Sequence, residues 1–250
     1  MKKIIISFFT IFLLFSCTKN KLQLVKIEGK LLPITEKLAS DSSIVKTYLP
    51  YKYKMEKEMN SVLCYTSKNL VATDGVLESS LGNLLADLCY KKGNFVFKKR
   101  TGKNIDFAMF NFRGIRAGIP KGNVTTQNAF NLMPFENNLV VVELSSKKLR
   151  ELIQYLITKK KAHPLSKQVR LRITKNGYNF SINGKPINDK KTYFVLTSDY
   201  LQHGGDHMDF FKNPVHLYEL DYKMRNAIID YFKETDTLKS NLDGRFVMKN

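Results

Sequence analysis

The run Leu139-Val-Val-Val-Glu-Leu144 constrains the fold of this chain more than any other segment. A strand with one face in water alternates apolar and polar residues, whereas a nearly continuous apolar run is typical of a strand covered on both faces. The sequence therefore predicts a central β-strand over Leu139–Leu144, in a sheet that has other elements packed on it.

Shorter β-rich runs accompany this strand, and they are Ile105–Phe110, Val169–Ile173, Tyr178–Ile182 and Tyr193–Thr197. Val169–Ile173 alternates apolar and polar residues, which predicts that one face of this strand meets solvent. Tyr178–Ile182 leads through Asn183-Gly184 into Lys185–Ile187, a pattern typical of a hairpin around an Asn-Gly turn.

Apolar residues at helical spacing predict helices between these strands. Their apolar faces are Leu81, Leu84, Leu85 and Leu88, which follow Ser79 or Ser80; Leu149, Leu152, Ile153 and Leu156, which follow Ser145-Ser146; and Leu220, Met224, Ala227, Ile228 and Tyr231. Asp41 is placed to cap a further helix to about Lys57, in which Pro50 predicts a kink or break. This alternation predicts an α+β fold, a mixed β-sheet flanked by helices.

The first 17 residues join Lys2-Lys3 to an apolar run, Ile4–Phe15, and then to Ser16-Cys17. This is the pattern of a signal peptide, because the run is too short to span a bilayer as a stable helix. Leu14–Cys17 also resembles a bacterial lipobox, so we expect lipidation of Cys17. A plain secretory signal with a chance cysteine is the alternative. The prediction is an exported lipoprotein, anchored in the outer membrane and facing the periplasm.

The remaining chain is predicted to form one domain. We assign 1–17 to the signal peptide, 18–37 to a tether and first strand, and 38–250 to the domain, since no Pro/Gly/Ser-rich linker or internal repeat interrupts it. Cys64 and Cys89 lie in apolar contexts, and both a disulfide and two buried free thiols remain open for them.

The chain is strongly basic, and loss of Lys2 and Lys3 only lowers its formal charge from +19 to +17. Nucleic acid, an anionic membrane surface or anionic small substrates could explain this charge. The basic residues are dispersed, and the runs Lys91-Lys92, Lys98–Arg100 and Lys159–Lys161 carry no interleaved aromatic residues. We therefore expect no nucleic-acid partner, because base-stacking and zinc-finger patterns are both missing.

Two loops after predicted strands have a composition suited to ligands. Gly114 and Gly118 bracket Arg116, whose planar guanidinium matches phosphate or carboxylate oxygens. An ordinary surface ion pair is the alternative, and composition alone favours it. Asp206 follows the glycine pair Gly204-Gly205 and could accept the two hydroxyls of a ribose.

Two aromatic residues stand beside these polar groups in the sequence. Phe135 and Tyr200 both lie in loops, so a flat base could be held between their rings.

Five ordered segments resemble the 5′-nucleotidase C-terminal domain over roughly Leu38–Phe232. They are Glu78-x-x-Leu-Gly-Asn-Leu-x-Ala-Asp87, Asp106-x-Ala-x-x-Asn111-x-x-Gly-Ile-Arg116, Gly122-x-Val-Thr125, Pro134-Phe135-x-Asn-x-Leu-Val-Val-Val-Glu-Leu144 and Asp199-Tyr-Leu-x-x-Gly-Gly-Asp206. The resemblance implies a nucleotide-recognition domain of that fold.

The resemblance also implies a substrate-binding set. Asn111 and Arg116 match the residues that contact phosphate and substrate, Phe135 and Tyr200 match the base-stacking aromatics, and Asp206 matches the ribose-binding carboxylate. Arg113, Gly114, Gly204 and Gly205 complete the expected set. The sequence departs from the family pattern at Arg113 and His207, where glycine is usual, and at Leu77, where some members carry a substrate-binding arginine.

The metal-binding half of that family has no counterpart here. Its two-metal hydrolysis uses Asp-x-His, Gly-Asn-His-Glu/Asp and Gly-His-x-His patterns. The histidines of this chain, in none of these patterns, are His163, His203, His207 and His216. Since the domain begins about 20 residues after Cys17, we expect no catalytic or metal-binding residue in the chain. Divalent metals are expected only in a separately encoded metallophosphoesterase partner.

Two hypotheses follow for the function. In the first, the chain is the nucleotide-binding subunit of a 5′-nucleotidase divided between two proteins. In the second, it is a binding lipoprotein that captures nucleotides or other phosphorylated or anionic solutes without hydrolysis. An autonomous enzyme is disfavoured, because no nucleophile, base or metal cluster is visible.

Overall fold

The computed structural model describes residues 23–248. Cys17 and the predicted signal peptide, residues 1–17, lie outside this range. The chain divides into two compact units, Met1–Tyr48 and Leu49–Asn250. Among the described residues, no helix has both the length and the apolar character needed to cross a membrane.

The described part of the first unit contains no β-strand. Residues 23–41 lack regular structure apart from a turn, so the first strand expected within 18–37 is wrong for 23–37, and the nearest strand is β1, Val62–Thr66. The expected helix is present as α2, Ser42–Met59. Asp41 caps it, because its Oδ1 accepts from the Ser43 N–H at 2.8 Å. Pro50 lies inside α2, which continues through it without a break.

The main sheet of the second unit has the strand order β2-β7-β4-β8. Its strands are β2, Phe107–Ala108; β4, Asn138–Ser145; β7, Thr192–Ser198; and β8, His216–Lys223. β2 is parallel to β7, while β4 is antiparallel to both β7 and β8. The sheet is therefore mixed, and Leu139–Leu144 is an interior strand, as predicted. The strand predicted over Ile105–Phe110 is confirmed but shorter, because only Phe107 and Ala108 pair as a strand.

Two smaller sheets complete the β-structure of the described chain, so the expectation of a single sheet is corrected to three. One has the order β3-β1-β9 and the other β10-β5-β6. The strands not yet given are β3, Gly122–Thr125; β5, Val169–Thr174; β6, Gly177–Ile182; β9, Thr237–Leu238; and β10, Phe246–Met248.

The predicted hairpin around Asn183-Gly184 is only half right. Both residues have left-handed φ angles, 49° and 75°, as a tight turn requires, and Ile182 and Lys185 exchange backbone hydrogen bonds of 2.9 and 3.0 Å. The residues after the turn, 185–191, are described but form no strand, and β6 pairs along its length with β5 instead.

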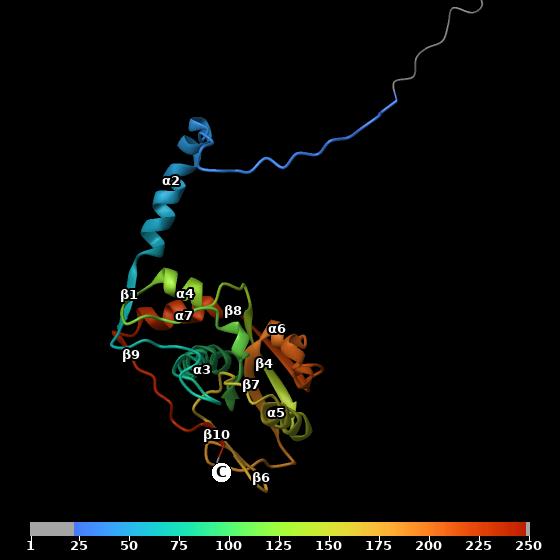
Figure 1. Ribbon diagram of the computed structural model, residues 1–250. Coiled ribbons are helices and arrows are strands. Elements are labelled where there is room, and N and C mark those ends of the chain that lie inside the picture. The colour runs from blue at the N-terminus through green and yellow to red at the C-terminus, as the bar shows by residue number, and fades with distance from the viewer. Residues whose placement is uncertain (1–22, 249–250) are drawn as a thin grey trace, which may run out of the picture. The chain divides into compact units, whose positions relative to one another are not determined.

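Helices cover both faces of the main sheet, with α3 and α5 on opposite sides of β4 and β7 (Figure 1). The α-helices that lie wholly within this unit are α3, Ser80–Thr101; α4, Thr126–Leu132; α5, Ser146–Lys159; α6, Asp199–Gln202; and α7, Met224–Lys233. Ser79 and Ser145 cap α3 and α5, as their sequence positions predict. Leu220, which the apolar pattern places on the last helix, belongs to β8, since α7 begins four residues later.

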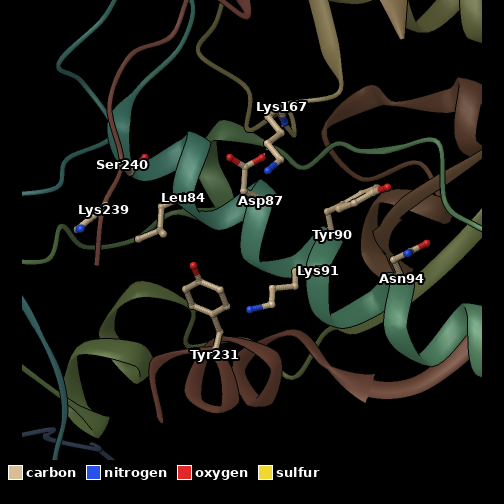
Figure 2. Close-up of a pocket in the computed structure, with 9 residues that line it drawn as sticks. All are labelled: Leu84, Asp87, Tyr90, Lys91, Asn94, Lys167, Tyr231, Lys239 and Ser240. Atoms are coloured by element: carbon tan, nitrogen blue, oxygen red, sulfur yellow. Dashed lines mark hydrogen bonds between the residues drawn. The ribbon is translucent and has the colours of Figure 1, made fainter. Parts of the chain in front are cut away.

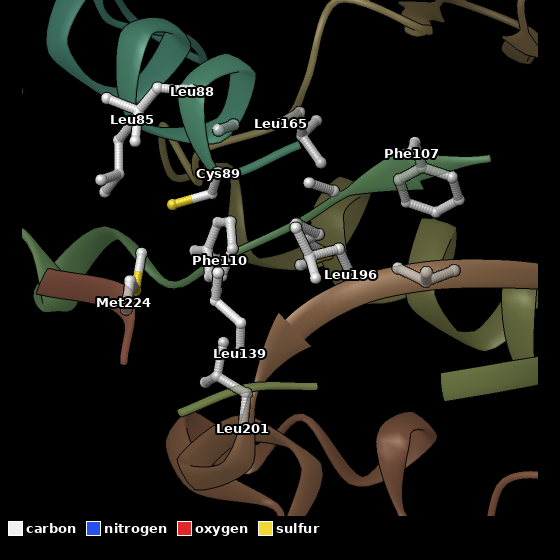
Figure 3. Packing of buried hydrophobic residues seen from close by; sticks show 14 of the residues in the cluster. Leu85, Leu88, Cys89, Phe107, Phe110, Leu139, Leu165, Leu196, Leu201 and Met224 are labelled. Carbon is white, nitrogen blue, oxygen red and sulfur yellow. The ribbon is translucent and has the colours of Figure 1, made fainter. Parts of the chain in front are cut away.

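One hydrophobic cluster joins these layers. In Figure 3, Cys89 of α3, Phe110, Leu139 of β4 and Leu201 of α6 follow one another through the core. Gly93 allows α3 to approach the sheet closely, because a Cβ there would lie 2.8 Å from a methyl group of Leu196. Burial of these apolar side chains is the main stabilising contribution to such a core.

The structure resolves the state of the two cysteines. Cys64 and Cys89 are free and buried. Burial raises the pKa of the Cys64 thiol to about 11, and burial also raises the pKa of Cys89. Both therefore behave as small apolar side chains rather than as reactive thiols.

A buried ion cluster holds the C-terminal segment against α3. Arg245 is 3% exposed; it donates to both carboxylate oxygens of Asp87, at 3.1 and 3.0 Å, and to those of Asp243, at 2.9 and 2.8 Å. Glu78 accepts from the Gly244 N–H at 2.8 Å. The two acidic ends of the Glu78–Asp87 segment are thus tied to the C-terminal segment.

We expect Arg245→Met to destabilise the protein by about 3 kcal/mol. Removing one partner of a buried ion pair typically costs about 3–5 kcal/mol, and Asp87 and Asp243 keep 31% and 36% of their side-chain exposure, which favours the low end. Denaturant unfolding measures the change. Arg100→Met is the control, because its pair with Asp221 is exposed and should contribute less than about 1 kcal/mol. Equal effects of the two substitutions would contradict this assignment.

Candidate functional site

The predicted ligand loops emerge at one edge of the main sheet. Because β2 is parallel to β7 and β4 is antiparallel to it, the carboxyl ends of β2 and β7 lie beside the amino end of β4. The loop 109–118 leaves β2 at this edge, residues 133–137 lead into β4, and α6 follows β7 directly. Segments far apart in sequence therefore meet there.

Asn111 begins the first of these loops and precedes a 3₁₀ turn, η1, Phe112–Gly114. Its carbonyl accepts from the Gly114 N–H at 3.1 Å. A Cβ on residue 114 would lie 2.7 Å from Asn111 Oδ1, so the position of the Asn111 side chain requires glycine at 114.

Asp206 connects three segments of the chain. Its Oδ2 accepts from Asn111 Nδ2 at 2.8 Å, and its Oδ1 accepts from the Tyr200 hydroxyl at 3.3 Å. Its backbone carbonyl accepts from the Tyr155 hydroxyl of α5 at 2.9 Å. The predicted residues Asn111, Tyr200 and Asp206 are thus brought together, and Tyr155 is an addition that the sequence did not indicate.

The Asp206 carboxylate is presented by an unusual backbone. Gly204, Asp206 and His207 have left-handed φ angles of 91°, 52° and 59°. Such angles are strained for residues with a side chain, which explains why glycine is the better residue at the position of His207. A Cβ on Gly205 would lie 2.4 Å from the Tyr200 ring, so this glycine lets the ring pack against the turn.

Phe135 and Tyr200 are accessible to a ligand, with 37% and 46% exposure. The Arg116 guanidinium lies 5.5 Å from the centre of the Phe135 ring. The segments that carry the two aromatics are joined by a hydrogen bond of 3.1 Å from the Asn138 N–H to Asp199 Oδ2. The two rings therefore belong to adjacent segments of one surface.

The loop of Phe135 is held from the interior by Arg225 of α7, a residue that no sequence pattern indicated. Arg225 is 8% exposed and its guanidinium lies 4.2 Å from the centre of the Phe130 ring. It donates to the Phe135 carbonyl at 3.3 Å and pairs with Glu136. These contacts fix the backbone that carries the aromatic ring.

His163 supports the Asn111 loop from the interior. It is 6% exposed, and its Nδ1 accepts from the Phe112 N–H at 3.2 Å. Burial lowers the pKa of His163 to about 4, although the nearby Asp206 carboxylate acts in the opposite direction. The imidazole is therefore neutral near pH 7, with its proton on Nε2, which has no hydrogen-bond partner among residues 23–248. A lone histidine before Pro164 carries no sequence signal for this role.

The residues at which the sequence departs from the resemblance occupy different environments. Leu77 is 3% exposed and belongs to the core. Arg113 and Arg116 are exposed, and within the described range neither forms an ion pair. The loop therefore presents two cations, and Arg113 adds a charge where glycine is usual in the family.

Within residues 23–248, no three His, Cys, Asp or Glu side chains are grouped closely enough to hold a metal ion. His163 lies in the loop before β5 and His216 in β8, while His203 is the C-cap of α6 and His207 lies in the 3₁₀ turn that follows it. The donor set for a two-metal centre is thus missing from the described part of the chain, and the expectation that metals belong to a partner remains a prediction.

The fold and the order of these loops along the chain are those of one known class of domain. The family model described as 5′-nucleotidase, C-terminal domain, matches residues 62–213. The chain belongs to this family, in agreement with the resemblance of its five segments.

Known relatives are considerably longer than this chain. The trifunctional nucleotide phosphoesterase protein YfkN of Bacillus subtilis is 29% identical over 88% of this chain and 16% of its own length. Protein UshA of Yersinia enterocolitica is 22% identical over 86% of the chain and 39% of its own length. A 5′-nucleotidase precursor from Thermus thermophilus shares the fold with a TM-score of 0.65 and 24% identity, over 85% of this chain and 44% of that structure. The chain thus spans less than half of each relative.

His163 should make the stability depend on pH. Its pKa is about 4 in the folded protein and near the ordinary 6.5 when unfolded, so the unfolded chain binds the extra proton as the pH falls from 6.5 to 4. Stability should therefore drop across this window, by roughly 3 kcal/mol at most. Denaturant unfolding at several pH values should show a smaller drop for His163→Gln. His216→Gln is the control, since His216 is exposed. If stability depends on pH in the same way in His163→Gln as in the unaltered chain, His163 is not the source of this pH dependence.

Proposed function

We propose that this chain is the nucleotide-recognition part of a 5′-nucleotidase-type phosphohydrolase and acts with a separately encoded metallophosphoesterase in nucleotide hydrolysis and salvage. The observation that supports this most is the Asp206 carboxylate, held by Asn111 and Tyr200 beside an exposed arginine loop. The family, and the printed functions of relatives such as a nucleotide phosphoesterase, agree with it.

Each part of this surface suits one part of a nucleotide. The Asp206 oxygens each accept one hydrogen bond in the structure, and a carboxylate oxygen can accept more than one. Asp206 can therefore receive ribose hydroxyls without releasing Asn111 or Tyr200. Phe135 and Tyr200 would contact the base, because base–aromatic stacking favours exposed rings. Arg116 would contact phosphate through its guanidinium fork.

The remaining members of the proposed substrate-binding set act through the loops. Gly114, Gly204 and Gly205 permit the close approaches at Asn111 and Tyr200 and the left-handed turn before Asp206. Arg113 adds a second cation close to the position of Arg116, and it would strengthen the attraction for a phosphate group.

The partner is proposed to supply the divalent metals, since the described residues contain no group able to hold them. Support for a docked partner comes from α2, a helix described over its whole length in which no residue is buried. Tyr51, Tyr53 and Met55 on this helix are 75%, 62% and 54% exposed. Large apolar side chains gathered on one exposed element often mark an interaction surface.

The proposal includes export and a lipid anchor at Cys17, which would keep the complex at the membrane surface in the periplasm.

A second candidate function is capture of nucleotides or other phosphorylated or anionic solutes without hydrolysis. The exposed pair Arg113 and Arg116 favours it, because two cations in one loop, without an ion pair in the described range, can bind an anion without any partner protein. Both candidates use the same surface and differ only in whether a metal-binding partner completes it.

A phosphate-release assay on AMP separates the two candidates. The first predicts release only when this chain is mixed with the lone metallophosphoesterase domain that we expect to be encoded beside it, in the presence of a divalent metal. Asp206→Asn in the mixture should lower the rate, since the ribose acceptor is weakened. AMP binding without release from the mixture would favour the second candidate, and release by this chain alone would contradict both.

Binding of AMP to the chain by calorimetry tests the surface itself. Arg116→Ala should weaken binding by about 1.5–3 kcal/mol, the scale of a hydrogen bond to a charged group. Phe135→Ala should weaken it by roughly 1–3 kcal/mol, the scale of base stacking. Matched controls are Arg172→Ala on β5 and Phe95→Ala on α3, since both side chains are exposed elsewhere. Affinity that is unchanged by Arg116→Ala would remove this residue from the site.

A further inference from the structure

A polar cavity of about 440 Å³ lies between α3, α7 and two loops. It shares no residue with the surface around Asp206. Its lining, shown in Figure 2, includes Asp87, Lys91, Lys167, Tyr231 and Lys239. Its volume falls in the range of small-molecule sites, roughly 300–1,000 Å³.

Three lysines from three separate segments line this cavity. Lys91 belongs to α3, Lys167 to the loop before β5, and Lys239 to the segment after β9. In Figure 2, Lys91 extends from α3 toward the Tyr231 ring, and its Nζ lies 5.3 Å from the centre of that ring. Lys167 lies beside Asp87 in the same view. The cations therefore come from tertiary contact and not from a local basic run.

The charge of the cavity is positive. Among the described residues, Asp87 is the only acidic one that lines it, and the Arg245 guanidinium, at 3.0 Å, neutralises it. Within residues 23–248, none of the three lysines forms an ion pair; the neighbouring Glu234 is paired with Lys92 instead. All three lysines are exposed, and a concave surface lined by one sign of charge attracts ions of the opposite sign, so the cavity favours an anion.

The floor of the cavity is partly apolar and fixed. Leu84, Asp87 and Lys91 are spaced along one face of α3, and Tyr231 approaches from α7. The Lys167 N–H donates to Asp87 Oδ1 at 2.7 Å, and the Ser240 hydroxyl donates to the Ser80 carbonyl at 2.7 Å. Both lysine-bearing loops are thus anchored to α3, so the segments that carry Lys167 and Lys239 stay at the cavity beside Lys91.

We infer that this cavity is a binding site for a multivalent phosphate group. Lysine ammonium groups are effective point-charge partners of phosphate oxygens, and a phosphate carries close to two negative charges at neutral pH. Three cations match a phosphate ester or diphosphate better than a singly charged carboxylate. The group could belong to a soluble organic phosphate or to a lipid headgroup, since both present the same oxygens.

Calorimetric titration of the full chain with pyrophosphate tests the site. The variant carries Lys91→Gln, Lys167→Gln and Lys239→Gln together. The control carries Lys98→Gln, Lys99→Gln and Lys175→Gln, which removes the same charge from exposed positions away from the cavity. We expect the first variant to bind pyrophosphate at least tenfold more weakly than the unaltered chain, and the control to stay within about twofold.

Two further arms separate this site from other sources of binding. The three lysine substitutions should lower the affinity for pyrophosphate by the same factor in a chain that carries Arg116→Ala as in the unaltered chain. This result is expected whatever Arg116→Ala does to AMP binding. If the group is a lipid headgroup, the chain should co-sediment with phosphatidylglycerol vesicles more than with phosphatidylcholine vesicles, and the three lysine substitutions should remove this difference. If the group is a soluble phosphate, the substitutions should not change the co-sedimentation. Equal losses in the lysine variant and its control, or no measurable pyrophosphate binding, would overturn the inference.

Discussion

The antiparallel pairing of β4 with β7 holds the candidate site together. It runs from Leu139 opposite Ser198 to Ser145 opposite Thr192, and most of its residues are buried between α3 and α5. Because β2 joins β7 in parallel, this pairing places the loop of Asn111, the loop of Phe135 and the turn of Asp206 at one edge. A shift of the register by one residue would turn every side chain to the opposite face of the sheet and disrupt its close packing against the helices, so the packing of the strand also fixes the site.

At that edge, a network of hydrogen bonds maintains a strained turn. The left-handed angles of Asp206 and His207 cost of order 1–3 kcal/mol each, and contacts from Asn111, Tyr155 and Tyr200 offset this cost. His163 and Arg225 hold the two flanking loops from the interior. The chain's own contacts therefore position the carboxylate, which would lower the ordering cost of the proposed nucleotide binding.

The residues shared with the family divide into two groups by what they contact. Glu78 and Asp87 hold the C-terminal segment through Gly244 and Arg245, whereas Asn111 and Asp206 face each other at the sheet edge. The first group also shapes the lysine-lined cavity, since Asp87 lies in its wall. The proposed nucleotide and phosphate sites therefore lie on one scaffold without sharing a residue, and they can be altered independently.

The local features of this protein could be predicted from its residues alone. Periodicity and capping serines predicted α3 and α5, the apolar run predicted β4, and the order of motifs indicated the family, because these signals arise from residues close together in the chain. Strand partners, by contrast, were set by tertiary packing: β6 pairs with β5, so the turn at Asn183-Gly184 formed without its second strand. The same packing joined Asn111 to Asp206 and placed His163, Tyr155 and Arg225 behind them. Such contacts depend on segments that are distant in sequence, which no local pattern encodes.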